Sequence, residues 1–238
     1  MKPSSPVMAM SGTWRHLPLG LMAACAFEAS HAARPMLTDD ARVVDPGHCQ
    51  VESWTVRQPS SRELWALPAC SGGPGTEWAL GGQRSRFDAP PKSSFTGIGQ
   101  YKRIVRDLSP GAVGMGVAVG SVFDESGALP YFYLPVSWMS RSESSLIHLN
   151  LGRGSSAERR LKDRTWGLGL EHQIADSIWL IAERYSPSAS QWQTQAGLRW
   201  WVIPGQLQLD ATTGQQHGAT MRTGLTSLGL RWIFPRPF

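Results

Sequence analysis

The feature that most constrains this chain is a repeated alternation of apolar residues with small or polar ones, in short runs separated by turn residues. In one such run, Trp192, Leu198 and Trp200 fall on one face of an extended strand, whereas Gln195 and Arg199 fall on the other. Successive side chains of a β-strand point to opposite faces, so this period of two predicts strands with one apolar and one polar face. The pattern is typical of an all-β protein.

About twelve runs of this kind can be counted, separated by Gly, Pro, Ser and Asp. An even number of antiparallel strands brings both ends of the sheet to the same side. The predicted strands cover residues 51–57, 62–69, 76–86, 96–108, 112–123, 129–140, 144–152, 164–174, 177–185, 191–203, 206–215 and 220–234.

The first 33 residues have the composition of a secretory signal peptide. Lys2 and Arg15 precede an apolar run, Leu17–Phe27, and small residues lead to a cleavage site near Ala33. That run is about half the roughly 20 residues that a membrane-spanning helix needs. An alternative cleavage before Cys25, as in a lipoprotein, stays open. We therefore predict a signal peptide over 1–33, a periplasmic N-terminal segment over 34–48 and a barrel domain over 49–238.

A leader followed by alternating strands favours one fold. In a soluble sandwich the apolar faces of two sheets cover each other, whereas in a membrane barrel they face lipid and the polar faces line the interior. We predict a transmembrane, antiparallel, up-and-down β-barrel in the bacterial outer membrane, monomeric, with lipid, lipopolysaccharide and the barrel-assembly machinery as partners. The expected C-terminal assembly signal comprises Leu230, Trp232, Phe234 and Phe238.

If both termini lie in the periplasm, Phe87–Phe95 and Arg153–Asp163 become the longest external loops, and the periplasmic turns are short. A two-residue turn at Pro204-Gly205 would pair Arg199 with Asp210 inside the barrel and Val202 with Leu207 outside. A bulge in this hairpin would shift the pairing by one residue.

Two cysteines follow the leader, Cys49 and Cys70, in a compartment where disulfides form. The topology places one at the start of the first strand and the other at the end of the second, both at the periplasmic rim. We predict that they form a disulfide. The two cysteines do not have the CxxC spacing that a metal or redox site would favour, and no metal or cofactor is predicted.

Charged and polar side chains fall on the inward phase of several strands. Such residues either form an ion-pair network that stiffens the wall or line a selective conduit, and the sequence leaves both interpretations open. The predicted lumen-lining residues are His148, Glu171, Glu183, Arg199, Asp210 and Arg231.

Charge and motifs argue against other classes of function. The net charge is +5, and loss of the leader lowers it to about +4, too small and too dispersed a surplus for a nucleic-acid-binding protein. Sets of Ser, His and acid that include His148, His172 or His217 exist, but none lies in a motif such as G-x-S-x-G. We predict no enzyme activity, and a lipid-modifying enzyme remains the third hypothesis.

The residues that follow the leader resemble a known family. Ala33-Arg-Pro-Met-Leu-Thr-Asp-Asp-Ala41, then Pro46-Gly47 and Gln50-Val-Glu52, are similar to the start of outer-membrane barrels grouped with the MetA-pathway of phenol degradation, often labelled transporters. The resemblance implies a monomeric barrel with its N-terminal segment near the periplasmic mouth and passive uptake of small, often hydrophobic or aromatic, molecules. The hypothesis that competes with uptake is a plugged structural or surface-interaction barrel. For Thr38, Asp39 and Asp40, a hydrogen-bonded turn and a binding site are the two interpretations.

Overall fold

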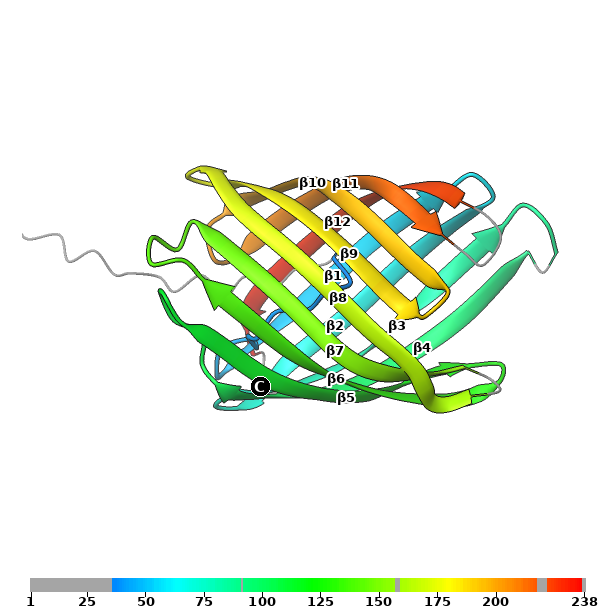
Figure 1. The fold of residues 1–238 in the computed structure, drawn as a ribbon, viewed down its shortest axis with the longest axis horizontal. Helices are drawn as coiled ribbons and strands as arrows, with labels where there is room; N and C mark the ends of the chain where they lie inside the picture. The colour runs from blue at the N-terminus through cyan, green and yellow to red at the C-terminus, as the bar shows by residue number, and fades with distance from the viewer. Residues whose placement is uncertain (1–35, 91, 157–158, 218–221, 237–238) are drawn as a thin grey trace, which may run out of the picture.

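The computed structural model describes residues 36–90, 92–156, 159–217 and 222–236. Within these residues twelve antiparallel strands follow one another around a closed barrel, and β12 pairs with β1 to complete it (Figure 1). This confirms the predicted fold class. The strands are β1 (His48–Gln58), β2 (Ser61–Gly73), β3 (Thr76–Phe87), β4 (Ser93–Arg106), β5 (Val113–Asp124), β6 (Gly127–Met139), β7 (Ser145–Ser156), β8 (Arg159–Ala175), β9 (Ile178–Ser188), β10 (Gln191–Ile203), β11 (Leu207–His217) and β12 (Arg222–Pro235).

The barrel has two distinct ends. The start of β1 and the end of β12 lie together on the left in Figure 1, and we call this the terminal end. The connections β1–β2, β3–β4 and the later odd-to-even connections lie at the other end, which we call the loop end. No helix within the described residues is long and apolar enough to cross a membrane.

Burial is inverted relative to a soluble protein. Outward side chains such as Leu80, Phe95 and Leu228 are large, apolar and about two-thirds exposed or more. Inward side chains such as Gln208 and Arg231 are polar and almost completely buried. An exposed apolar surface together with a buried polar interior is the arrangement that lipid outside and hydrogen-bonding groups inside would favour.

The strands extend further toward the loop end than the alternation indicates. Residues 153–163, predicted to form a long external loop, continue the β7–β8 ladder, in which Arg153 pairs with Arg164 and Ser156 with Arg159. Gly and Ser in this stretch give no apolar signal, although their backbones still pair. The prediction of longer loops outside than inside was therefore wrong: residues 107–112, at the terminal end, form a longer connection than residues 88–92, at the loop end.

The β10–β11 hairpin has the predicted register over most of its length. Arg199 pairs with Asp210 and Trp200 with Leu209. The register then shifts, so that Ile203 rather than Val202 faces Leu207. Gly205 adopts a positive φ in the turn, and Gln206 donates its N–H to the Ile203 carbonyl, so the connection is one residue longer than the predicted two-residue turn.

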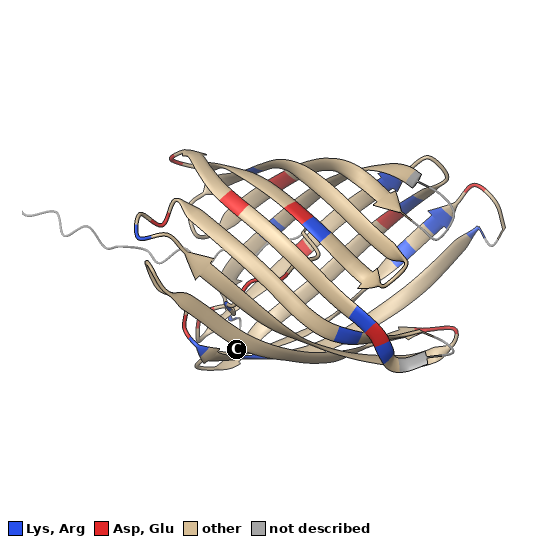
Figure 2. Cartoon of the chain, in the orientation of Figure 1, with Lys and Arg blue, Asp and Glu red and all other residues tan. Residues whose placement is uncertain are grey.

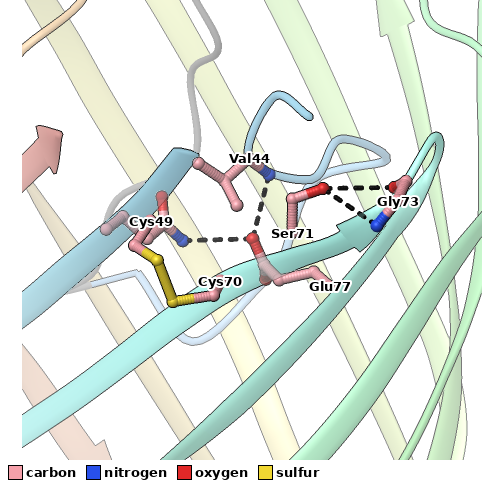
Figure 3. The surroundings of a disulfide bond; sticks show 7 residues. Val44, Cys49, Cys70, Ser71, Gly73 and Glu77 are labelled. Atoms are coloured by element: carbon pink, nitrogen blue, oxygen red, sulfur yellow. Dashed lines mark hydrogen bonds between the residues drawn. A yellow bond between two sulfur atoms is a disulfide. The ribbon is translucent and has the colours of Figure 1, made fainter. Parts of the chain in front are cut away.

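The predicted disulfide between Cys49 and Cys70 is confirmed. These residues are directly opposite in the β1–β2 ladder, with their Cα atoms 4.0 Å apart, at the terminal end (Figure 3). The bridge therefore joins the first two strands where the chain enters the barrel.

Apolar side chains also lie inside the barrel. At the terminal end Met139, Leu146, Trp179 and Trp201 form a buried cluster. Trp179 and Ile181 point inward, which explains why the predicted strand over 177–185 appeared apolar on both faces. Trp201 is buried in this cluster, whereas the adjacent Trp200 is half exposed on the outer surface.

Some predicted features fall partly or wholly outside the described residues. The leader, 1–33, lies outside them, and so does Phe238 of the predicted assembly signal. Of the other three members, Leu230 and Trp232 are exposed on the outer face of β12, and Phe234 packs against Trp232, with ring centroids 5.0 Å apart.

Candidate functional site in the barrel lumen

The N-terminal segment, residues 36–47, leads into the barrel from the start of β1. The side chains of Met36, Asp40 and Val44 are almost completely buried. The family resemblance placed this segment near the periplasmic mouth, whereas the structure places residues 36–44 against the lumen wall. The segment forms neither helix nor strand, so its backbone groups need partners from elsewhere.

Two side chains of the wall bind the first part of the segment. Glu183 on β9 accepts the backbone N–H groups of Leu37 and Thr38, each at 2.8 Å. Asn150 on β7 accepts the N–H of Asp39 and donates its amide to the carbonyl of the same residue, both at 2.7 Å. The Glu183 carboxylate and the Asn150 amide thus supply hydrogen bonds that a neighbouring strand would otherwise provide.

Two further wall residues bind the second part of the segment. Ser137 on β6 accepts the N–H of Ala41 at 2.8 Å, and Glu77 on β3 accepts the N–H of Val44 at 2.9 Å (Figure 3). The backbone of the segment is therefore bound by side chains from β3, β6, β7 and β9. These strands lie on different sides of the lumen, so the segment bridges it.

The two acids of the segment bind a buried lysine. Lys102 on β4 places its Nζ 2.9 Å from Asp39 Oδ2 and 3.6 Å from Asp40 Oδ1. Asp40 Oδ1 also accepts the Arg42 N–H, so the predicted hydrogen-bonded turn and a charged contact occur together. Burial raises the pKa of the Asp40 carboxyl, and the positive charge of Lys102 acts in the opposite direction.

The wall carries its own ion-pair network. Arg199 Nη1 lies 2.6 Å from Glu171 Oε1, and Arg199 Nε lies 3.1 Å from Asp210 Oδ1. Gln208 donates its amide to the carboxylate of Asp210 at 3.0 Å. Since Arg199 and its two carboxylate partners come from β10, β8 and β11, this network cross-links three strands of the wall.

A serine, a histidine and an acid lie in a row at mid-lumen. Ser137 Oγ is 2.8 Å from His148 Nδ1, and His148 Nε2 is 3.3 Å from Glu171 Oε1. The order resembles that of a hydrolytic triad. However, Ser137 is completely buried and its Oγ accepts the Ala41 N–H, while Glu171 is bound to Arg199. A substrate carbonyl cannot approach Ser137 while the N-terminal segment is in place.

The space in the lumen is unequally divided. Around the N-terminal segment a cavity of about 30 Å³ remains, lined by Asp40, Lys102, His148 and other polar groups, which is room for one or two water molecules. On the loop-end side of the segment lie two larger cavities of about 300 and 230 Å³. Leu37, Tyr185 and Pro187 line both, so these cavities adjoin and form what we call the vestibule.

The vestibule is lined with aromatic rings and amides. Trp54 and Trp65 stack with ring centroids 5.0 Å apart on one side. Tyr131 and Tyr133 face it from β6. The Tyr131 hydroxyl donates to Gln100 Oε1 at 2.9 Å, and the Tyr133 hydroxyl donates to Asp39 Oδ2 at 2.6 Å and also lies 3.1 Å from Gln100 Oε1. Further amide side chains in its lining are Gln58, Gln193, Gln195 and Gln216. Such a surface offers ring faces for stacking and neutral hydrogen-bonding groups.

The structure brings the residues singled out from the sequence into one lumen, where they have three different sets of partners. His148, Glu171, Arg199 and Asp210 belong to the wall network, and Glu183 binds the N-terminal segment. Arg231 stands apart and donates to Gln50 Oε1 at 2.8 Å. All six predicted lumen residues are at most 4% exposed.

The sequence pattern did not identify Lys102 and Glu77 as residues of the site. Lys102 lies on the inward phase of β4, between Gln100 and Ile104, and an inward lysine facing an acidic N-terminal segment was the signal that would have identified it. His172, a candidate in the enzyme hypothesis, lies on the outer face and is 2.9 Å from Ser145 Oγ. Within the described part of the chain, no group of three His, Cys, Asp or Glu residues could hold a metal ion.

These features define the class of the protein: a closed twelve-stranded barrel with an apolar outer surface and an N-terminal segment inside a polar lumen. The chain belongs to the family described as Uncharacterised conserved protein UCP029691, whose model matches residues 20–231. The match does not confirm the phenol-degradation family that the opening residues resemble. No curated protein matches the chain.

Three solved structures of outer-membrane proteins have a similar fold. The KdgM porin has a TM-score of 0.60 at 9% identity, over 78% of this chain and 99% of its own. The NanC porin has a TM-score of 0.58 at 8% identity, over 77% and 98%. Outer membrane protein Omp33 of Acinetobacter baumannii has a TM-score of 0.55 at 7% identity, over 79% and 98%. At these identities the likeness extends to the fold alone.

Proposed function

We propose that this chain is a monomeric outer-membrane protein that allows passive uptake of small solutes, and that residues 36–47 act as a plug controlling passage. The observation that carries the proposal is how the plug is bound. Its backbone is held by Glu183, Asn150, Ser137 and Glu77, all of them groups that water can solvate when the segment leaves. A barrel whose polar wall binds a plug that can leave is suited to act as a conduit.

The lining of the vestibule indicates which class of solute the protein would bind. Rings from Trp54, Trp65 and Tyr131 alternate with amides, and the charged residues in the described lining of the two cavities are Glu63 and Arg153. A small molecule with a flat apolar face and a few hydroxyl or carbonyl groups would bind there by stacking and neutral hydrogen bonds. The solute would reach the vestibule from the loop end, which we assign to the cell exterior.

A reversible cross-link tests the plug directly. Ala41 N lies 2.8 Å from Ser137 Oγ, so the pair Ala41→Cys and Ser137→Cys places a thiol on the plug beside one on the wall. In planar bilayers the oxidised variant should be silent, and a reductant should restore conductance steps. Wild-type protein treated with the same reductant controls for loss of the Cys49–Cys70 bridge. Steps that are equal with the plug locked and released would rule out its gating role.

The competing hypothesis, a plugged barrel without transport, predicts a different outcome. Replacing Lys102 by Ala removes the cation that binds Asp39 and Asp40 and should make openings more frequent if the plug moves. Silence of both wild type and Lys102→Ala, in barrels shown to be folded, would favour the structural or surface-interaction role.

We also propose that the protein is not an enzyme, because the plug covers Ser137. Incubation with phospholipid or lipopolysaccharide, comparing wild type with His148→Ala and His172→Ala, tests this. Hydrolysis that depends on either histidine would contradict the proposal.

A further inference from the structure

We propose that the outer surface of β1–β3 carries a binding site for the phosphorylated headgroup of lipopolysaccharide. Four arginines lie there: Arg57 on β1, Arg62 on β2, and Arg84 and Arg86 on β3. All four are exposed and occupy the outward phase of their strands, near the loop end. The loop-side end of β3 is accordingly coloured as basic in Figure 2. The proposal rests on the outer-membrane location proposed above.

The register places three of these cations in one row. Arg57 is the cross-strand partner of Arg62, and Arg62 is the partner of Arg86. Arg84 lies one pleat closer to the terminal end, opposite Leu64. Like charges directly opposite one another on adjacent strands destabilise a sheet, so a row of three arginines favours an anion between them.

Within the described residues, no acid of β1, β2 or β3 supplies that anion, and Asp88, which follows β3, forms no ion pair with the four arginines. The acids on these strands, Glu52, Glu63 and Glu77, lie on the inward phase, and Glu63 accepts the Trp65 indole N–H. Among the described residues, none of the four guanidinium groups donates a hydrogen bond or forms an ion pair.

The surface around the arginines has the shape and polarity of a bound amphiphile. A groove of about 480 Å³ is lined by the four arginines together with Thr55, Val56, Glu63 and Leu64. On the terminal-end side, Leu64, Leu80 and Phe95 are each more than half exposed. Cations therefore border an apolar strip in the direction in which acyl chains would run.

The arginines also lie at a suitable depth. Arg86 follows Trp78, an exposed aromatic residue near the terminal end, by eight positions on β3. At 3.3 Å per residue and a strand tilt of about 40°, this is about 20 Å along the barrel axis, against an apolar band about 25 Å tall. A long arginine side chain can extend the remaining distance to the headgroups.

The chemistry of the arginine side chains indicates which lipid would bind. Guanidinium groups bind phosphate oxygens in a bidentate manner, and four of them around one groove match a lipid with two phosphates on a sugar rather than one with a single phosphodiester. Lipopolysaccharide, with a bis-phosphorylated lipid A and several acyl chains, combines these phosphates with a partner for the apolar strip.

Lipid binding by the full-length mature barrel, purified in mild detergent, tests the site. The variant Arg62→Gln/Arg86→Gln is compared with Arg103→Gln/Arg106→Gln, which removes two exposed arginines from the terminal end of β4. Each protein is titrated with bis-phosphorylated lipid A, monophosphorylated lipid A, phosphatidylglycerol and inorganic phosphate. The central pair of the cluster should matter most, so we expect about tenfold weaker binding of bis-phosphorylated lipid A by the first variant and little change in the second.

The other ligands distinguish the sources of phosphate. Weaker binding of monophosphorylated lipid A and phosphatidylglycerol by wild type supports the site. Equal binding of all three lipids, tight binding of inorganic phosphate alone, or equal loss in both variants would overturn it. Heat-modifiable migration in gels, measured first, separates this failure from that of the proposed function: a folded outer-membrane barrel that does not bind lipid A refutes the lipid site only.

Discussion

Arg199 is the central residue of the ion-pair network in the wall. It lies between Glu171 and Asp210, and all three are buried. A buried carboxylate that loses its cation retains the cost of desolvation without the compensating attraction. Removing Arg199 should therefore cost more stability than its ion pairs contribute on balance.

Replacing Arg199 by Ala should consequently lower the free energy of unfolding by about 3–5 kcal/mol. Urea unfolding of the refolded barrel in detergent, followed by Trp fluorescence, measures the change. Arg141→Ala, an exposed arginine in the β6–β7 turn, is the control and should cost less than about 0.5 kcal/mol. Equal losses in the two variants would mean that Arg199 forms no buried network.

At the scale of elements, the first hairpin carries a covalent constraint. Cys49 and Cys70 are 21 positions apart in sequence and directly opposite in the ladder. A bridge closing a loop of this length restricts the unfolded chain by about 3 kcal/mol in the chain-entropy account. Cys49→Ser/Cys70→Ser should lower the urea midpoint correspondingly under oxidising conditions. Midpoints that coincide with wild type would show that the bridge does not stabilise the barrel.

The outer face of β10 provides a test of depth. Leu198 lies near the middle of the strand and Val202 near its end, on the same outward face. In a bilayer, an arginine at the midplane costs about 2–4 kcal/mol and one near the interface about 0–1 kcal/mol. Leu198→Arg should therefore destabilise the barrel in lipid vesicles much more than Val202→Arg. Equal effects would indicate that this face does not contact lipid.

The strands and the hairpin pairings are the elements that the sequence predicts best, because each residue's face follows from a strict period of two. The Arg199–Asp210 pairing and the Cys49–Cys70 bridge follow from that period and from one turn. Strand ends were less predictable, since residues such as Gly154 and Ser156 give no apolar signal although their backbones pair. The extra residue in the Pro204–Gln206 turn depends on local backbone geometry.

For the whole molecule, the sequence predicts the barrel but not what lies inside it. Residues 36–47 have no periodicity, and their position depends on contacts with Glu77, Asn150 and Glu183 on distant strands. These contacts form only in the closed barrel, so the sequence pattern does not predict them. Thr38, Asp39 and Asp40 were recognised by resemblance to a family, but the partner of the two acids, Lys102, appears only in three dimensions.

The central claim is that the outer face of the wall touches lipid while the inner face does not. Trp200 and Trp201 are adjacent on β10 and point in opposite directions, 49% and 4% exposed. The measurement is quenching of Trp fluorescence by brominated phosphatidylcholine, in wild type and in the variants Trp200→Phe and Trp201→Phe. The account predicts that Trp200→Phe removes a strongly quenched component and Trp201→Phe an unquenched one. Equal quenching of the two residues, or a protein that stays soluble and unquenched without detergent, would contradict it.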